Sequence, residues 1–105
     1  MRLKETENDF NTWLLDAFHL FGWHTAHFRV AKSEKGWRTP VSGDGKGFPD
    51  WFVVRGKRVL MIEAKSDKGK LSPEQKQWFE WLKDTPIERY VWRPKDRKII
   101  EEILK

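Results

Sequence analysis

The chain has 105 residues, the size of a single domain spanning residues 1–105, and it contains no cysteine. The lack of cysteine excludes both a disulfide framework and a thiolate metal site. No apolar run approaches the roughly 20 residues of a membrane span, and residues 1–10 are too charged for a signal peptide. We therefore expect a cytoplasmic protein with no membrane partner. The formal net charge of +5 suits a polyanion such as nucleic acid, although many small soluble proteins carry it without binding one.

Residues 5–21 are predicted to form a helix, because apolar side chains recur there at the i, i+3, i+4 spacing of one helical face. Those side chains are Phe10, Trp13, Leu14, Ala17 and Phe21. Thr6 is the predicted N-cap, with Asp9 three residues later, and Gly22 ends the helix. Glu7 falls on the inward face. A carboxylate there either interacts with the positive end of the helix dipole or serves a metal or water site.

Residues 23–30 are predicted to form the first strand, and residues 31–47 a long loop. His24 and His27 would point to opposite faces of the strand, which makes them a poor metal-binding pair. The loop combines cations with an aromatic residue and glycines, and this mixture suits phosphate contacts and base stacking. A surface loop whose lysines only keep the protein soluble is the alternative. The predicted DNA contacts are Lys32, Lys35, Trp37, Arg38 and Lys46.

The glycines of the 43–47 segment do not form a nucleotide-binding loop. The segment lacks the Gly-Lys-Ser/Thr ending of a P-loop. We therefore expect no nucleotide cofactor.

Two apolar runs, residues 51–55 and 58–65, flank a short basic turn, and this pattern predicts a β-hairpin. Asp50 directly precedes the first strand, and Glu63 and Lys65 lie at the end of the second. Because side chains alternate along a strand, Glu63 and Lys65 share one face. Charges at the end of an apolar strand are costly to bury without partners. Two carboxylates and a lysine at one end of a sheet suit a metal-dependent phosphodiesterase, whereas a turn aspartate beside a structural ion pair is the plainer interpretation.

The C-terminal third is predicted to hold a helix, a strand at residues 88–92 and a terminal helix at residues 95–104. Ser72 is the predicted N-cap of the first helix, followed by Pro73, and Gln75 can close a capping box. The inward residues are predicted to be Trp78, Phe79 and Leu82 in the first helix and Ile99, Ile100, Ile103 and Leu104 in the second. This order of elements predicts an α/β fold in which helices flank a mixed sheet.

Pro49-Asp50, followed by Glu63-Ala64-Lys65, resembles the signature of the PD-(D/E)xK nucleases. Three other segments make this resemblance more specific. Residues 43–50, 71–75 and 91–94 together resemble the stand-alone VRR-NUC domains of phages and bacteria. The resemblance covers nearly the whole chain. It implies the αβββαβ core of the PD-(D/E)xK nuclease fold, in a bacterial or phage-infected cell.

The resemblance also implies hydrolysis of DNA phosphodiester bonds with Mg²⁺, for which Mn²⁺ can substitute. Asp50 and Glu63 would hold the ion, and the backbone carbonyl of Ala64 is an expected further ligand. Lys65 would orient the attacking water or stabilise developing negative charge. Glu7 matches a glutamate of the family's first helix and is a candidate catalytic and metal-binding residue. The products would carry 5′-phosphate and 3′-hydroxyl ends.

Three further residues each have a functional and a structural interpretation. The family has a glutamine near the active centre at the place of Gln75, which therefore either supports the site or serves only as a helix cap. It has a histidine near His27, although a structural histidine is the favoured interpretation. Arg93 would contact DNA or pair with an acidic residue.

Stand-alone VRR-NUC domains look like Holliday junction resolvases that act as homodimers. A two-fold dimer would match the two symmetry-related phosphates of a junction. Cleavage of flaps or other branched DNA is a close rival. A non-catalytic DNA-binding module with a nuclease fold is the alternative from another class. A sequence-specific restriction enzyme fits less well, because the chain has no room for a recognition subdomain.

Overall fold

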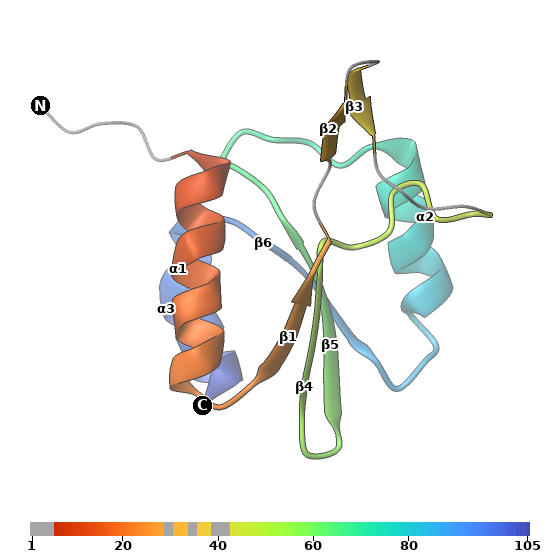
Figure 1. Ribbon diagram of the computed structural model, residues 1–105. Helices are drawn as coiled ribbons and strands as arrows, with labels where there is room; N and C mark the ends of the chain where they lie inside the picture. The colour runs from red at the N-terminus through yellow and green to blue at the C-terminus, as the bar shows by residue number, and fades with distance from the viewer. Residues whose placement is uncertain (1–5, 29–30, 34–35, 39–42) are drawn as a thin grey trace, which may run out of the picture.

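A computed structural model describes residues 6–28, 31–33, 36–38 and 43–105. These residues form a four-stranded sheet, a separate two-stranded hairpin and helices on both faces of the larger sheet (Figure 1). In chain order the elements are α1 (Glu7–Leu20), β1 (His24–His27), β2 (Ala31–Ser33), β3 (Gly36–Arg38), β4 (Trp51–Arg55), β5 (Arg58–Ala64), α2 (Pro73–Leu82), β6 (Glu88–Trp92), the 3-10 helix η1 (Pro94–Asp96) and α3 (Arg97–Leu104).

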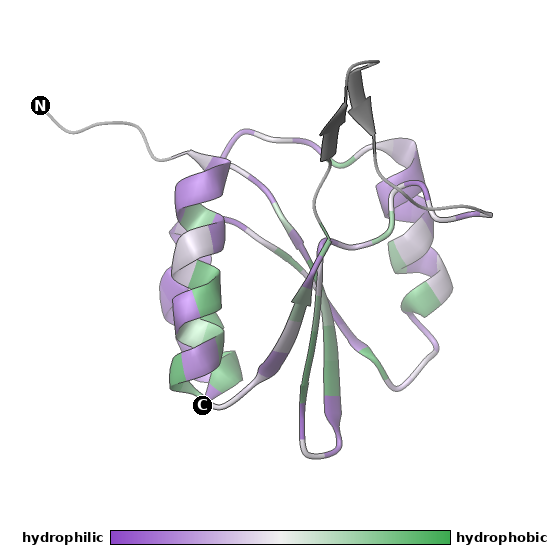
Figure 2. Ribbon diagram, in the orientation of Figure 1, coloured by the Kyte–Doolittle hydropathy of each residue, from purple (hydrophilic) through white to green (hydrophobic). Residues whose placement is uncertain are grey.

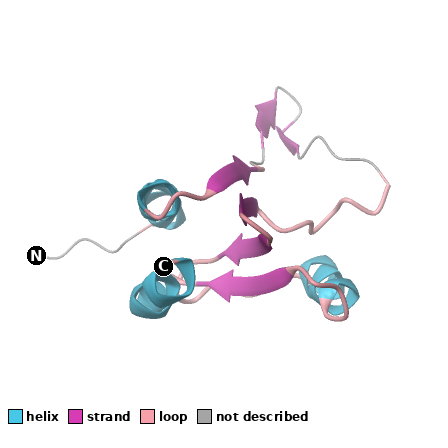
Figure 3. Ribbon diagram, turned by 90° about the horizontal axis from the view of Figure 1, so that it is seen from below, coloured by secondary structure: helices cyan, strands magenta, loops and turns pink. Residues whose placement is uncertain are grey.

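The larger sheet is mixed and has the strand order β1-β4-β5-β6. β4 pairs antiparallel with both β1 and β5, whereas β5 and β6 run parallel. Helices α1 and α3 lie against one face of the sheet and α2 lies against the other (Figures 1 and 3). The predicted α/β class and the mixed, helix-flanked sheet are therefore confirmed.

The β4–β5 hairpin fixes which residues meet at the two ends of the sheet. Its register pairs Arg55 with Arg58 and Trp51 with Ile62. The turn has two central residues, and the first, Gly56, has a φ of +60°. A positive φ at this position matches the type II′ turn, whose twist agrees with that of the strands. One step beyond the pair of Trp51 and Ile62, the same register places Asp50 opposite Glu63.

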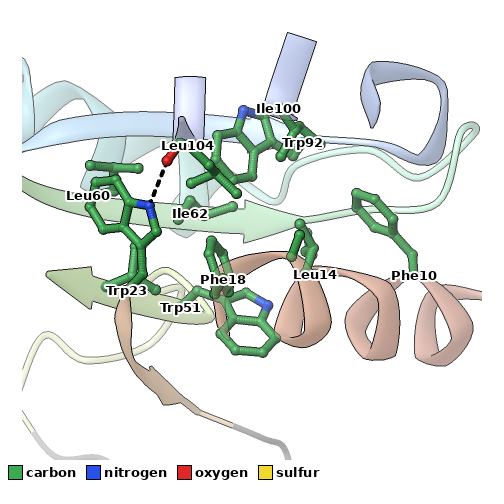
Figure 4. Packing of buried hydrophobic residues seen from close by; sticks show 13 residues of the cluster. Phe10, Leu14, Phe18, Trp23, Trp51, Leu60, Ile62, Trp92, Ile100 and Leu104 are labelled. Atoms are coloured by element: carbon green, nitrogen blue, oxygen red, sulfur yellow. Dashed lines mark hydrogen bonds between the residues drawn. The ribbon is translucent and has the colours of Figure 1, made fainter. Parts of the chain in front are cut away.

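The main hydrophobic core lies between the sheet and helices α1 and α3. Figure 2 shows the most hydrophobic stretches in the central strands, and Figure 4 shows how the large side chains interdigitate. The Trp23 indole N–H donates to the Leu104 carbonyl at 3.0 Å, so this deeply placed ring has its polar atom satisfied. The fully buried members of this core are Phe10, Leu14, Phe18, Val53, Leu60, Ile62, Ala64, Ile100 and Leu104.

The opposite face of the sheet is covered by α2. Alternation along β5 directs Leu60 and Ile62 toward the main core, so Met61 and Glu63 point toward the α2 side. Met61 and Leu82 are the buried hydrophobic residues outside the main core cluster in the part of the chain that the structure describes. A buried carboxylate therefore occurs on the face with less apolar cover.

Both predicted helix caps are confirmed. The Thr6 hydroxyl accepts from the Asp9 N–H at 3.0 Å, and the Asp9 carboxylate accepts from the Thr6 N–H at 3.2 Å. Ser72 and Gln75 form the same reciprocal box at the start of α2, with Pro73 at its first position. Such boxes satisfy backbone N–H groups that a helix leaves free in its first turn.

Several predicted boundaries were wrong. The first strand ends at His27 rather than at residue 30, and the predicted 31–47 loop contains the β2–β3 hairpin. Runs of three residues are too short to show an alternation pattern, which is why the sequence did not predict this hairpin. The terminal α-helix begins at Arg97 rather than at residue 95, and the 3-10 turn at Pro94–Asp96 precedes it. Proline is accepted in such a first turn because the N–H that it lacks would have no partner there.

Two predicted core assignments also need correction. Ile99 is 61% exposed rather than inward, because it lies one residue off the face that Ile100 and Leu104 bury. In α1 the fully buried Phe18 belongs to the core, whereas Phe21 is only partly buried. Within the described part of the chain, no helix is long and apolar enough to span a membrane.

Gly47 allows the segment before β4 to lie directly against the start of α2. Its φ is +82°, and a Cβ built on it would lie 2.6 Å from the Glu74 carbonyl carbon and 2.7 Å from the Gln75 nitrogen. We expect Gly47→Ala to lower the free energy of unfolding by roughly 2–4 kcal/mol, because backbone overlap adds to the strain of positive φ. Urea unfolding followed by circular dichroism measures this change.

Gly22→Ala is the matched control for this substitution. Gly22 has a similar φ of +78°, but a Cβ there would meet nothing within 4 Å. The control should lower the free energy of unfolding by only the roughly 1–2 kcal/mol that a positive φ costs a residue with a Cβ. Equal losses in the two variants would show that the contact between Gly47 and α2 has no energetic weight.

Candidate active site

Asp50 lies between the ends of β1 and β5. The Phe28 N–H donates to the Asp50 carbonyl at 2.7 Å, and the Ala64 N–H donates to Asp50 Oδ2 at 3.3 Å. The residue is only partly buried. Its carboxylate is therefore anchored through one oxygen to the end of β5, beside Glu63.

Glu63 is the buried carboxylate of this end of the sheet. It is 2% exposed, and within the described residues its Oε1 has no hydrogen-bond partner. Burial raises the pKa of Glu63 well above 4.5, and the hydrogen bond and negative charge of Asp50 raise it further. The positive charge of Lys65 acts in the opposite direction. The arrangement brings together Asp50, Glu63 and Lys65, as the sequence predicted.

Lys65 is held at the site by its backbone and by the loop that follows it. Its N–H donates to the Trp92 carbonyl at 3.0 Å, which extends the pairing of β5 with β6. Arg93 Nη1 donates to the carbonyls of Ser66 and Gly69, both at 2.6 Å. Arg93 therefore shapes the loop beside Lys65 through backbone contacts, a role that neither sequence alternative had named.

Glu7 approaches the site from the first turn of α1. Although much of its side chain is exposed, partial burial and the negative charge of Asp50 raise the pKa of Glu7, while Lys65 lowers it. One turn later, Asn11 Oδ1 accepts the Trp51 indole N–H at 3.0 Å, which ties α1 to the residue after Asp50. Glu7 is therefore exposed rather than buried on the inward face of α1, although its carboxylate is near enough to Asp50 and Lys65 to be affected by both charges.

His27 stacks on Trp51, the residue that follows Asp50. It is the Cα partner of Trp51, and the two rings are stacked with centroids 3.9 Å apart and planes 4° apart. Trp51 packs in the main core, on the face opposite to that of Glu63. The favoured interpretation of His27 as a structural residue agrees with this stacking.

Gln75 acts as a helix cap in this structure. Its Oε1 accepts from the Ser72 N–H at 2.8 Å, and its own N–H donates to Ser72 Oγ at 3.1 Å. A further contribution of Gln75 to the site stays a prediction. Its backbone also packs tightly against Gly47, which connects α2 to the segment that leads to Asp50.

Most predicted DNA contacts fall outside what the structure describes. Lys35 belongs to the undescribed residues, and the side chains of Lys32, Trp37 and Arg38 are likewise outside the description. Lys46 is described, and its ammonium lies 3.2 Å from the Glu74 carboxylate on an exposed surface. Exposed pairs of this kind are weak and exchange readily with other anions.

The residues at this end of the sheet fit a hard divalent cation. The unpaired oxygen of Glu63 lies next to a second carboxylate, and such oxygen donors are those that Mg²⁺ prefers. Among the residues described, no three His, Cys, Asp or Glu side chains form a metal cluster by themselves. An ion would therefore need a backbone carbonyl, water or phosphate oxygens to complete its shell, which is usual for Mg²⁺.

A mixed sheet covered by helices, with two carboxylates and a lysine at the end of the central hairpin, defines an α/β domain of the PD-(D/E)xK nuclease type. The sequence matches the VRR-NUC domain over residues 22–96, most of the chain, and the chain belongs to this family. It is therefore a nuclease-like domain with DNA as its substrate. Helix α1, which carries Glu7, precedes the matched residues. Comparisons with curated proteins and with solved structures found no match.

The buried carboxylate should destabilise the protein in the absence of metal. Because the folded state holds the Glu63 proton more tightly than the unfolded state does, its stabilising contribution is full below pH 4.5 and is lost as pH rises through the raised pKa. We expect Glu63→Gln to increase the free energy of unfolding at pH 8 in EDTA by about 1–3 kcal/mol. The difference from wild type should shrink at pH 5, as measured by urea unfolding.

Glu101→Gln on the exposed surface of α3 is the control, and it should leave stability nearly unchanged at both pH values. Other groups that titrate between pH 5 and pH 8 are common to all three proteins and cancel in the comparison. A less stable Glu63→Gln variant at pH 8 would mean that the charged carboxylate has a structural partner.

Proposed function

We propose that this protein is a Mg²⁺-dependent endonuclease that hydrolyses phosphodiester bonds in branched DNA, with Holliday junctions as the leading substrate. The observation that carries the proposal is the buried Glu63 carboxylate, which has a free oxygen and faces Asp50 beside a lysine. Burying such a group is costly, because one of its oxygens has no partner and its neighbour is a second carboxylate. Perturbed carboxylates of this kind are common at catalytic sites.

Each side chain has a distinct role in this proposal. Asp50 and Glu63, with the carbonyl of Ala64, would hold the divalent cation. When bound, the ion would supply Lewis acidity that activates water and offsets charge on the phosphate. Lys65 would donate to the attacking water or to a non-bridging phosphate oxygen. Glu7, with its carboxylate near Asp50 and Lys65, would accept a hydrogen bond from water at the edge of the site.

The proposal includes a homodimer and a cytoplasmic setting. A four-way junction presents two symmetry-related phosphates, and a two-fold dimer would present two sites of matching symmetry. The formal net charge of +5 favours association with DNA. Multi-angle light scattering of the free protein would measure the number of subunits.

Cleavage should depend on Asp50. With a labelled four-way junction and Mg²⁺, we expect wild type to cut and Asp50→Asn to lose roughly 100-fold or more in rate, since loss of a metal ligand removes several kcal/mol of transition-state stabilisation. The measurement is the rate of product formation on a denaturing gel. Asp16→Asn, on the exposed surface of α1, is the matched control and should cut at the wild-type rate.

EDTA should abolish cutting by wild type, and linear duplex and flap substrates would show which DNA structure is preferred. Junction DNA that is bound but never cut, at any Mg²⁺ or Mn²⁺ concentration, would favour a non-catalytic DNA-binding module. A wild-type cutting rate in the Asp50→Asn variant would show that cleavage does not take place at this site.

Metal binding should also be visible without DNA. A ligand that binds only the folded state at ten times its Kd adds about 1.4 kcal/mol, which raises the Tm of a domain of this size by roughly 5–10 °C. We expect Mg²⁺ or Mn²⁺ to raise the Tm of wild type and of Glu101→Gln relative to EDTA. Asp50→Asn and Glu63→Gln should show no rise. Equal shifts in all four proteins would place the ion elsewhere.

A further inference from the structure

A chain of four aromatic rings extends from the candidate site across the α2 side of the molecule. Phe28, Phe48, Trp78 and Trp81 contact one another edge to face in that order, with centroid distances of 5.8, 5.0 and 5.1 Å. At one end, the Phe28 N–H donates to the Asp50 carbonyl. The two end residues are exposed, Phe28 by 46% and Trp81 by 51%. The proposed hydrolysis uses none of these rings.

The far end of this chain of rings opens into a cavity of about 250 Å³ between the 43–46 segment and α2. Trp78 and Trp81 form its aromatic wall, and the Trp78 indole N–H donates to the Asp44 carbonyl at 3.0 Å, which fixes that ring. Pockets for drug-sized molecules are roughly 300–1,000 Å³. The cavity therefore has room for one planar ring system and not for a folded peptide.

The polar groups of the cavity favour a base over a phosphate. Its only described cation, Lys46, is already paired with Glu74, and Asp44 adds a second carboxylate. These charges repel a phosphate at close range. Carboxylate and amide oxygens, including that of Gln77, instead accept hydrogen bonds from the exocyclic amino groups of bases.

We propose that this cavity binds one unstacked nucleobase of the DNA substrate, with the base stacked on Trp81. The inference rests on the proposed function for the identity of the polymer. The strand would pass along the exposed rings toward Asp50. A base in a continuous duplex is stacked and paired, so the cavity selects DNA that has an unpaired nucleotide near the cleavage point. Flaps present such a nucleotide directly, and a four-way junction presents one when the base pair at its branch point opens.

The test is a binding measurement in EDTA, where no cutting can occur. Fluorescence anisotropy would compare a labelled single-stranded oligonucleotide with the same strand in a duplex. We expect Trp81→Ala to weaken binding of the single strand roughly 5- to 100-fold, the effect of losing one stacking partner, and to leave the duplex affinity unchanged. Trp81→Phe should retain most of the single-strand affinity, because it keeps an aromatic face.

Ile99→Ala is the control, since Ile99 is a similarly exposed apolar residue on α3, on the other side of the sheet. An unchanged single-strand affinity in Trp81→Ala, or an equal loss for duplex DNA, would overturn the proposal. So would light scattering in which Trp81→Ala converts a dimer into a monomer, because that result would make the surface an interface between two copies. Circular dichroism melts would confirm that the variants are folded.

The binding test and the cleavage test can fail separately. A protein that binds single strands through Trp81 but cuts no DNA in Mg²⁺ would contradict the proposed nuclease activity. The proposal that the cavity binds a base would stand. A protein that cuts junctions but binds single strands equally well without Trp81 contradicts the pocket alone.

Discussion

The antiparallel register of β4 and β5 is the constraint on which the candidate site depends. It places Asp50 opposite Glu63, and the Ala64 N–H then anchors the Asp50 carboxylate. The same alternation that directs Leu60 and Ile62 into the main core turns Glu63 to the face with thinner apolar cover. A slip of one residue would exchange these faces, placing the carboxylate in the core and the core residues at the site. Core packing therefore holds the site in register.

Much of the fold could be predicted from the sequence because local signals agreed with one another. The hairpin followed from two apolar runs around a glycine turn, and the meeting of Asp50, Glu63 and Lys65 followed from alternation within it. Both capping boxes followed from residue types at fixed spacing. The last strand, Glu88–Trp92, has the predicted bounds. Periodicity misplaced Ile99, because isoleucines lie on more than one face of the terminal helix.

The contacts that could not be predicted are between residues far apart in the chain. Each depends on the direction in which a side chain points, which the sequence does not give. Asn11 and Trp51 meet because the Trp51 indole N–H reaches from β4 to helix α1, and an asparagine in a helix gives no sign of its partner. Arg93 bonds two backbone carbonyls rather than DNA or an acid. An arginine has five donors and many possible acceptors, so its type and position did not choose among them. The stacking of His27 on Trp51 likewise depends on the observed pairing of β1 with β4.

The close approach of Gly47 to the start of α2 has a geometric consequence for how DNA would be cut. With no side chain between them, the segment leading to Asp50 lies in direct contact with the start of the helix that bears Trp81. A base seated on that helix would then lie at a constant offset from the carboxylates. The protein would work as a molecular ruler, and the scissile bond would be set by counting nucleotides from the unpaired base rather than by reading sequence.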